Sequence, residues 1–179
     1  FLWHNYGKST IGSRSDIERV PIDRLKAFYR LWYRPGNAML VVAGKFDEAR
    51  TLAKIAQLYG PIPNPPEPLP STYTTEPAQD GEREVILRRV GDVQMTGAVY
   101  HVPAGSHPDF AAVEVAAFIL GDEPSGRLYK TLVESKAATS VFASAWQLHD
   151  PGVLIVGAEA SKESSLTEIR NVMLKTTEE

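Results

Sequence analysis

A proline-rich stretch divides this sequence of 179 residues. Seven of the 13 prolines fall within residues 60–81, GPIPNPPEPLPSTYTTEPAQDG. Because proline fixes φ and lacks a backbone N–H, such a stretch can enter neither a helix nor a central strand. We therefore expect a semi-rigid, extended linker between two folded parts, residues 1–59 and residues 82–179. The functional alternative is a docking segment for a proline-binding domain, since residues 63–66 are locally polyproline-like.

The part before the linker predicts a helix, a strand and a second helix. Asp23 can cap the first helix, whose apolar stripe consists of Leu25, Phe28, Tyr29 and Trp32. The continuous apolar run of residues 38–43 is typical of a strand buried on both faces. Asp47 then opens the second helix. Since one strand cannot form a sheet, its partner strands must come from elsewhere.

The part after the linker predicts the order strand, strand, helix, helix, strand, strand, helix. We expect paired strands over residues 82–90 and 93–102, because Gly91-Asp92 between β-rich runs indicates a hairpin. Two further strands are expected over residues 139–148 and 153–160. This order favours an α+β fold, a two-layer sandwich in which a mainly antiparallel sheet is covered by helices.

Capping residues mark the three helices of this second part. Pro108 suits the first turn of one helix, Ser125 the cap of the next, and Ser165 with Glu168 forms a capping box for the last. The helical periodicity predicts that these helices bury Val113, Ala116, Ala117, Leu120, Leu128, Tyr129, Leu132, Leu166, Ile169 and Met173.

Composition excludes several classes of protein. A chain with 43% hydrophobic residues and a net charge of only −3 is not intrinsically disordered. Its longest apolar run, residues 38–44, is too short for a membrane span. The lack of cysteine excludes disulfides, a thiolate nucleophile and a Cys-zinc site. Because the chain opens on FLWHNY without an initiator Met, we expect a fragment of a longer protein, and its compartment cannot be read from this sequence.

Charge is distributed unevenly between the two parts. Residues 1–59 carry ten Lys and Arg against five Asp and Glu, a net charge of +5, so the remaining residues carry −8. A basic lobe can bind nucleic acid. Here the basic residues are spread over helix faces beside acidic ones, so we expect solvated helix surface and no nucleic-acid or membrane partner.

No catalytic constellation is visible in the sequence. The four histidines are His4, His101, His107 and His149, and no two of them have the i, i+4 spacing of a helical metal-binding pair. No phosphate-binding loop and no nucleophile elbow is present. The sequence therefore predicts no catalytic and no metal-binding residue, and it identifies no substrate-binding residue.

Several motifs, taken together and in order, resemble one family. Before the linker these are residues 10–12 (TIG), 16–17 (DI), 25–29 (LKAFY), 32–38 (WYRPGNA) and 40–47 (LVVAGKFD). After it come residues 120–122 (LGD), 125–129 (SGRLY) and 132–136 (LVESK). The combination looks like the pitrilysin/insulinase family of zinc metallopeptidases, which includes mitochondrial processing peptidase and bacterial zinc proteases. The resemblance extends over nearly the whole chain.

This resemblance implies a fold and an activity for the parent protein. The family fold is a pair of similar α+β domains per half, of the LuxS/mitochondrial processing peptidase-like metallohydrolase type. Residues 1–59 resemble the closing part of a first domain, residues 60–81 the linker, and residues 82–179 the leading part of a second domain. The parent would be a zinc-dependent endopeptidase that hydrolyses peptides. The family's inverted His-x-x-Glu-His zinc motif matches no position here, so we expect this fragment to hold no zinc and to be inactive.

Two positions bear on which half of the protease is present. Family halves that complete the active site without binding zinc look to carry an Arg and a Tyr where this chain has Val133 and Ser140. Neither side chain here can clamp a substrate carbonyl. The resemblance thus implies the zinc-bearing half, with a partner half or subunit supplying Arg and Tyr. A non-catalytic scaffold or partner subunit of the same fold is the alternative. Strand edges left free at either boundary also predict that copies of the fragment associate.

Overall fold

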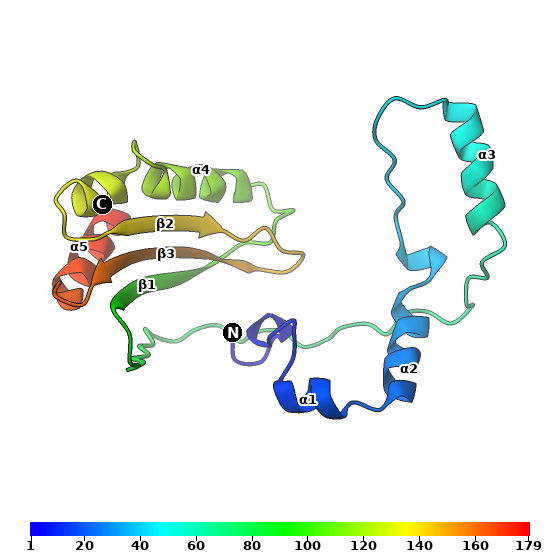
Figure 1. The fold of residues 1–179 in the computed structure, drawn as a ribbon, viewed down its shortest axis with the longest axis horizontal. Helices are drawn as coiled ribbons and strands as arrows, with labels where there is room; N and C mark the ends of the chain where they lie inside the picture. The colour runs from blue at the N-terminus through cyan, green and yellow to red at the C-terminus, as the bar shows by residue number, and fades with distance from the viewer. The chain divides into compact units, whose positions relative to one another are not determined.

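The computed structural model describes residues 1–179, which divide into two units, Phe1–Glu84 and Val85–Glu179. The first unit contains the helices α1, Arg14–Arg19, α2, Ile22–Trp32, and α3, Glu48–Tyr59, with the short 3-10 turns η1, Asn5–Gly7, and η2, Pro35–Asn37 (Figure 1). The second unit contains three strands and the remaining helices. None of the helices combines the length and the hydropathy that crossing a membrane requires.

Side-chain caps explain where helices of the first unit begin. The Ser13 hydroxyl accepts a hydrogen bond from the backbone N–H of Asp16 ahead of α1, and the Asp47 carboxylate accepts one from Arg50 ahead of α3. These bonds satisfy N–H groups that have no partner inside the helix. The expected cap Asp23 instead lies in the first turn of α2, because Pro21 occupies the capping position without a side-chain bond.

The predicted strand of residues 38–43 is absent from the first unit. These residues run without a sheet partner, and Val41 and Met39 are exposed. The apolar stripe of α2 is exposed as well, and no residue of Phe1–Glu84 is buried. The prediction of a buried strand was wrong for this structure because hydrophobic, β-branched residues form a strand only where neighbouring strands satisfy their backbone groups.

The second unit is built on a three-stranded antiparallel sheet. Its strands are β1, Val93–Val102, β2, Ser140–Ala145, and β3, Gly152–Ser161, in the spatial order β1-β3-β2. The central strand β3 pairs with β1 from Val93↔Ser161 to Val102↔Gly152 and with β2 from Ser140↔Glu159 to Ala145↔Leu154. The predicted α+β class with an antiparallel sheet covered by helices is therefore confirmed.

The hairpin predicted at Gly91-Asp92 was wrong. Residues 82–90 form no strand, and their apolar side chains are exposed. β1 takes its partner from β3 instead, through ten consecutive residue pairs. A two-residue turn signal carries only local preference, whereas the ladder with β3 satisfies backbone groups along the whole of β1.

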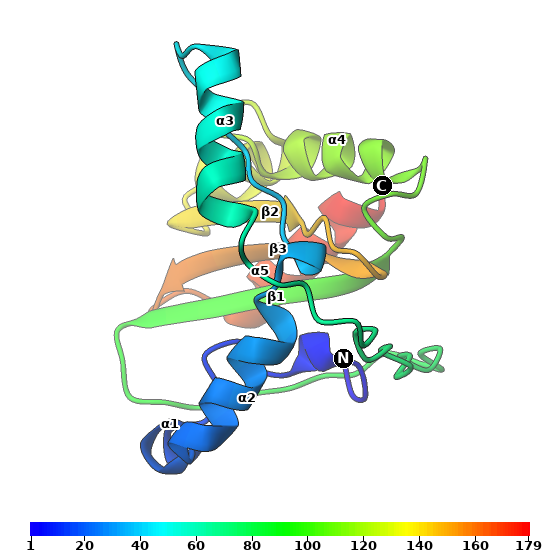
Figure 2. The ribbon, with the colours of Figure 1, turned by 90° about the vertical axis from the view of Figure 1, so that its right-hand side faces the viewer.

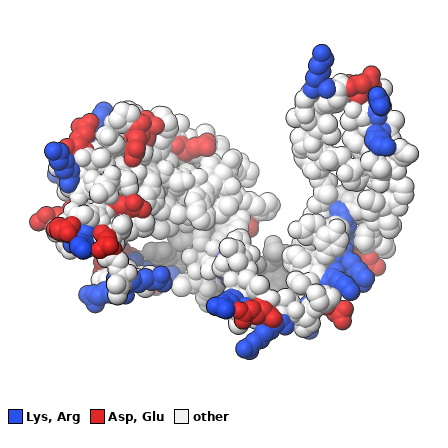
Figure 3. Space-filling view, in the orientation of Figure 1, with Lys and Arg blue, Asp and Glu red and all other residues white.

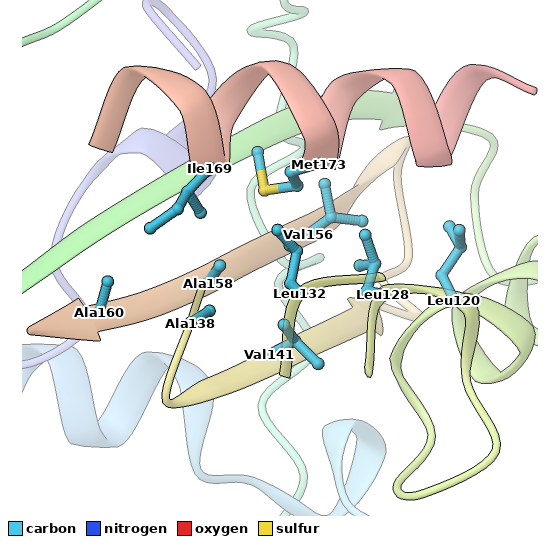
Figure 4. Close-up of a cluster of buried hydrophobic side chains, with 10 residues drawn as sticks. All are labelled: Leu120, Leu128, Leu132, Ala138, Val141, Val156, Ala158, Ala160, Ile169 and Met173. Atoms are coloured by element: carbon cyan, nitrogen blue, oxygen red, sulfur yellow. The ribbon is translucent and has the colours of Figure 1, made fainter. Parts of the chain in front are cut away.

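Helices cover one face of this sheet. α4 spans Phe110–Gly121, the π-helical turn η3 spans Tyr129–Val133, and α5 spans Leu166–Glu178 after the cap Ser165 (Figures 1 and 2). Side chains from all three meet β2 and β3 in one cluster, shown in Figure 4: Leu120, Leu128, Leu132, Ala138, Val141, Val156, Ala158, Ala160, Ile169 and Met173. Burial of this apolar surface stabilises the unit.

The helix predicted from Ser125 is shorter and wound differently. The Ser125 hydroxyl donates to the Asp122 carboxylate instead of capping the helix, and residues 129–133 are π-helical. Thr131 and Ser135 turn their hydroxyls back onto carbonyls of the preceding turn. Such back-bonding competes with the regular α-helical ladder, and π-helical turns are frequent at functional sites.

Candidate functional site

The second unit has a pocket beside the π-helical turn. The pocket has a volume of about 340 Å³ and lies between η3 and the start of α5. Its polar lining consists of hydroxyls and a single carboxylate, above an apolar floor: Thr131, Leu132, Ser135, Ala137, Ser164, Ser165, Glu168, Ile169 and Val172. The sequence predicted core or capping roles for Leu132, Ser165, Glu168 and Ile169, and Leu132 and Ser135 also belong to the family-like motif of residues 132–136, but nothing in the sequence indicated a pocket.

The polar groups of this pocket are engaged in local structure. Ser135 Oγ donates to the carbonyl of Thr131 at 2.8 Å, and Ser165 Oγ accepts from the Glu168 backbone at 3.4 Å. Glu168 is the only side chain of the pocket that could act as a general base, and no hydrogen bond joins its carboxylate to one of the pocket hydroxyls. The geometry suits a small polar ligand or water and provides no nucleophile–base pair.

The histidines singled out from the sequence lie in separate places. His4 Nδ1 accepts from the backbone of Tyr6 at 3.2 Å in the first unit. In the second unit, His107 Nδ1 accepts from the Asp109 backbone at 3.2 Å, and His149 lies 3.2 Å from the Asp150 carboxylate. His101 belongs to β1. None of them belongs to a group of three or more His, Asp or Glu side chains that could hold a metal ion.

The residues of the chain do not fit a zinc ion. Zinc in proteins is held by three or four converging N, S or O ligands. Across residues 1–179, no group of three or more His, Cys, Asp or Glu side chains could hold a metal ion. These residues therefore provide no site at which zinc could take part in catalysis.

Val133 and Ser140 also lie apart from any reactive group. Val133 ends η3 and packs against the buried cluster of the second unit. Ser140 begins β2, and its hydroxyl lies 3.3 Å from the carboxylate of Glu159 on β3. Val133 thus contributes to packing, and the Ser140 hydroxyl contacts the neighbouring strand.

The face of the sheet opposite the helices carries exposed apolar side chains together with polar ones, and we call it the open sheet face. The intervening residues belong to the core side, so strand alternation places on this face the apolar Met95, Val99, Ile155 and Phe142, the buried Val153, and the polar His101, Ser140, Ser144 and Glu159. Val99 is 63% exposed and Met95 57% exposed. Contiguous exposed apolar surface is a feature of sites that contact other chains.

Two facing glycines shape the centre of the open sheet face. Gly97 of β1 is paired with Gly157 of β3, so neither strand contributes a side chain there. The ring of Phe142, paired with Gly157 from the other side, lies against the Gly157 Cα where a Cβ would stand. The Phe142 ring thus fills the space that a side chain at position 157 would occupy.

Charge does not concentrate on the face of the molecule seen in Figure 3. Lys and Arg side chains alternate with Asp and Glu on both units. In the first unit, Arg14 Nε and Glu18 Oε1 pair at 2.6 Å along α1. Exposed pairs of this kind contribute little to stability.

Comparison with known proteins gives consistent matches. The family described as "Peptidase M16 inactive domain" matches residues 19–179. The zinc protease PqqE of Helicobacter pylori is 29% identical over 158 residues, which are 87% of this chain and 36% of that protein. The crystal structure of a protease from Helicobacter pylori matches 98% of this chain and 43% of that chain, with a TM-score of 0.91 and 26% identity.

A further solved structure shares the fold. The peptidase M16 inactive domain from Pseudomonas fluorescens matches 96% of this chain and 42% of that chain, with a TM-score of 0.77 and 21% identity. The chain thus spans less than half the length of the relatives that it matches.

Proposed function

Because the chain belongs to the peptidase M16 inactive domain family, we propose that it is a non-catalytic, chamber-forming part of a zinc-dependent endopeptidase. The main support for the proposal is the family match over residues 19–179. The structural similarity to a protease from Helicobacter pylori, with a TM-score of 0.91, agrees with it. The pitrilysin/insulinase resemblance of the sequence agrees with this family. In the parent protein, zinc would be held by residues outside this chain, since the donors present here do not fit it.

The role of the chain in peptide hydrolysis would be structural. The open sheet face offers an extended apolar surface of a kind that accommodates peptide side chains, with Val99 and Met95 exposed upon it. We assign this face to the inner wall of the chamber, where peptide substrates would lie. Val133 and Ser140, in place of Arg and Tyr, favour a zinc-bearing half whose partner half or subunit supplies those two side chains.

The second candidate is a scaffold or partner subunit of the same fold that has lost catalysis. Val133 packs against the buried cluster. A purely structural residue at this position favours the scaffold, because a scaffold needs no catalytic side chain there. The two candidates differ in one feature of the gene, since only the first requires a His-x-x-Glu-His motif upstream of residue 1. A parent sequence without that motif selects the scaffold.

Activity and zinc content test the proposal directly. The purified chain is expected to hold less than stoichiometric zinc and to leave a fluorogenic peptide intact, with or without added zinc. Hydrolysis by the chain alone, abolished by a chelator, would contradict the proposal.

A matched pair of substitutions tests the open sheet face in the natural protein that contains residues 1–179. Val99→Asp places a charge on this face, and Val115→Asp places the same charge on the outer surface of α4, at 63% and 57% exposure respectively. We expect Val99→Asp to lower kcat/KM for peptides by roughly tenfold, the effect of about 1.4 kcal/mol, with zinc content unchanged. If the two substitutions lower kcat/KM equally, the open sheet face does not line the chamber.

A further inference from the structure

Glu159 places a carboxylate on the middle strand of the open sheet face. The strand β3 lies between β1 and β2, and the register pairs Glu159 with Met95 on one side and with Ser140 on the other. The side chain is half-buried, and the only polar contact of its carboxylate is the Ser140 hydroxyl, 3.3 Å from Oε2. A carboxylate that is partly removed from water loses hydration, and a single hydroxyl replaces little of it.

No basic side chain of the chain pairs with Glu159. Lys162, the nearest lysine along the sequence, has its Nζ 3.0 Å from Asp92 Oδ1 and pairs with that carboxylate. His101 is the other ionisable side chain of the open sheet face, and the register places it at the opposite end of the ladder, roughly 20 Å along the strands. The charge of Glu159 is therefore available to a cation from another molecule.

The next position of this face along β1 carries no side chain. Gly97 follows Met95 by two residues and is paired with Gly157. A Cβ at Gly97 would meet only backbone atoms of β3, the Val156 carbonyl oxygen and the Gly157 Cα, so no side chain covers this position. A glycine inside a strand is typical of a place where another chain or a ligand approaches the backbone closely.

Apolar side chains border this uncovered position. Met95 and Val99 precede and follow Gly97 on the same face of β1, and both are more than half exposed. The Phe142 ring lies on the neighbouring Gly157. A large apolar side chain placed over Gly97 would therefore exchange water for apolar contacts along β1 and toward β2.

We propose that the open sheet face binds an extended peptide segment with Lys or Arg at Glu159 and a large apolar residue two positions away, over Gly97. Side chains on one face of a strand are two residues, roughly 6.6 Å, apart, and the same spacing separates side chains on one side of an extended peptide. One side of the peptide thus presents its basic side chain to Glu159 and its apolar side chain to Gly97. The inference rests on the proposed function and names the class of peptide that this face selects.

Peptide binding tests the basic residue in the natural protein that contains residues 1–179. The probes are two fluorescein-labelled decapeptides that differ only in a central Lys or Gln and carry Phe two positions from it. Fluorescence anisotropy measures their affinities in the cold, and mass spectrometry checks that each probe stays intact. We expect the Lys probe to bind roughly fivefold more tightly than the Gln probe, as an ion pair at the surface implies.

Two substitutions separate the parts of the site. Glu159→Gln keeps the size of the side chain and should abolish the preference for Lys over Gln. Glu114→Gln is the matched control, because Glu114 is exposed on α4 at the other side of the sheet, and it should keep the preference. Val99→Ala removes apolar surface beside Gly97, so it should reduce the preference for the Phe probe over one with Ala at that position and keep the preference for Lys.

Three results would overturn the inference. The first is equal affinity of the unsubstituted protein for the Lys and Gln probes, or no binding of either. The second is a preference for Lys that survives Glu159→Gln. The third is an equal loss of that preference in the Glu159→Gln and Glu114→Gln variants. Failure of the proposed function is a separate result, because there Val99→Asp and Val115→Asp act equally on peptides of any charge.

Discussion

Single residues account for the strongest contacts of this chain, and Glu76 is the clearest case. Its carboxylate accepts hydrogen bonds from the backbone N–H groups of Leu2 at 2.6 Å, Trp3 at 2.8 Å and His4 at 2.9 Å. Nothing in the sequence distinguishes Glu76 from the chain's other carboxylates, because these three donors lie more than 70 positions away. Asp47 is the opposite case, since its partner lies three residues along the chain and its capping role can be read from the sequence.

The backbone hydrogen bonds, that from His4 above all, lower the pKa of Glu76 from 4.5 to about 2, which predicts an acid-dependent contribution to stability. A carboxyl whose pKa is lower in the folded state binds protons more readily when unfolded, so its contribution is fully present above pH 4.5. The contribution declines as the pH falls and is absent below about pH 2. A titration of the Glu76 side chain by NMR should give a midpoint near pH 2, and a midpoint near 4.5 would mean that the backbone donors do not bind it.

A substitution of Met173 tests the buried cluster of the second unit. Its side chain is 0% exposed within the cluster, whereas its neighbour Val172 is 40% exposed on the same helix. We expect Met173→Ala to lower the free energy of unfolding of the second unit by about 2–5 kcal/mol, through lost burial and a cavity. Val172→Ala should lower the free energy of unfolding by clearly less than Met173→Ala does. Urea denaturation of both variants measures the difference, and similar losses would contradict the assigned core.

Elements depend on partners to different degrees. Helix α5 carries its own cap at Ser165 and its own apolar stripe, and both were predictable. Residues 38–43 and 82–90 have equally good β composition and yet form no strand, because strand formation needs another segment at hydrogen-bonding distance. The pairing of β1 with β3 over ten residues could not be read from either strand alone.

The pairing of β2 with β3 gives a prediction for Gly157. A methyl group at this position would collide with the Phe142 ring, so Gly157→Ala should destabilise the second unit by about 1–3 kcal/mol. In a Phe142→Ala background the ring is absent, and the same substitution should then cost markedly less. A double-mutant cycle of unfolding free energies measures this coupling. Additive effects would mean that the ring does not lie on Gly157.

At the scale of the whole molecule, the two units differ in how much apolar surface they bury. The second unit contains every buried residue of the chain, and the first contains none. Exposed apolar side chains such as Leu25 and Phe28 on α2 lack a covering layer, and β1 is an edge strand. Surfaces of this kind favour association with other chains.

Self-association of the 179-residue chain remains a prediction. We expect its apparent mass to rise with concentration in sedimentation experiments. Leu25→Glu combined with Phe28→Lys should reduce that rise, because the two charges interrupt the exposed stripe of α2. A monomer at all concentrations would contradict the prediction.

The sequence by itself determined the α+β class, the family, the helices that carry their own capping residues and several of the helical core positions, although Ala116 of α4, predicted to be buried, is exposed. These depend on local bonds and on periodicity, which act between residues close in the chain. Only the tertiary structure decided the strand order β1-β3-β2, the loss of the strands expected at residues 38–43 and 82–90, and the attachment of Glu76 to the start of the chain. Each of these depends on donors and acceptors that are distant in sequence, and local composition does not specify which distant partner will be within reach.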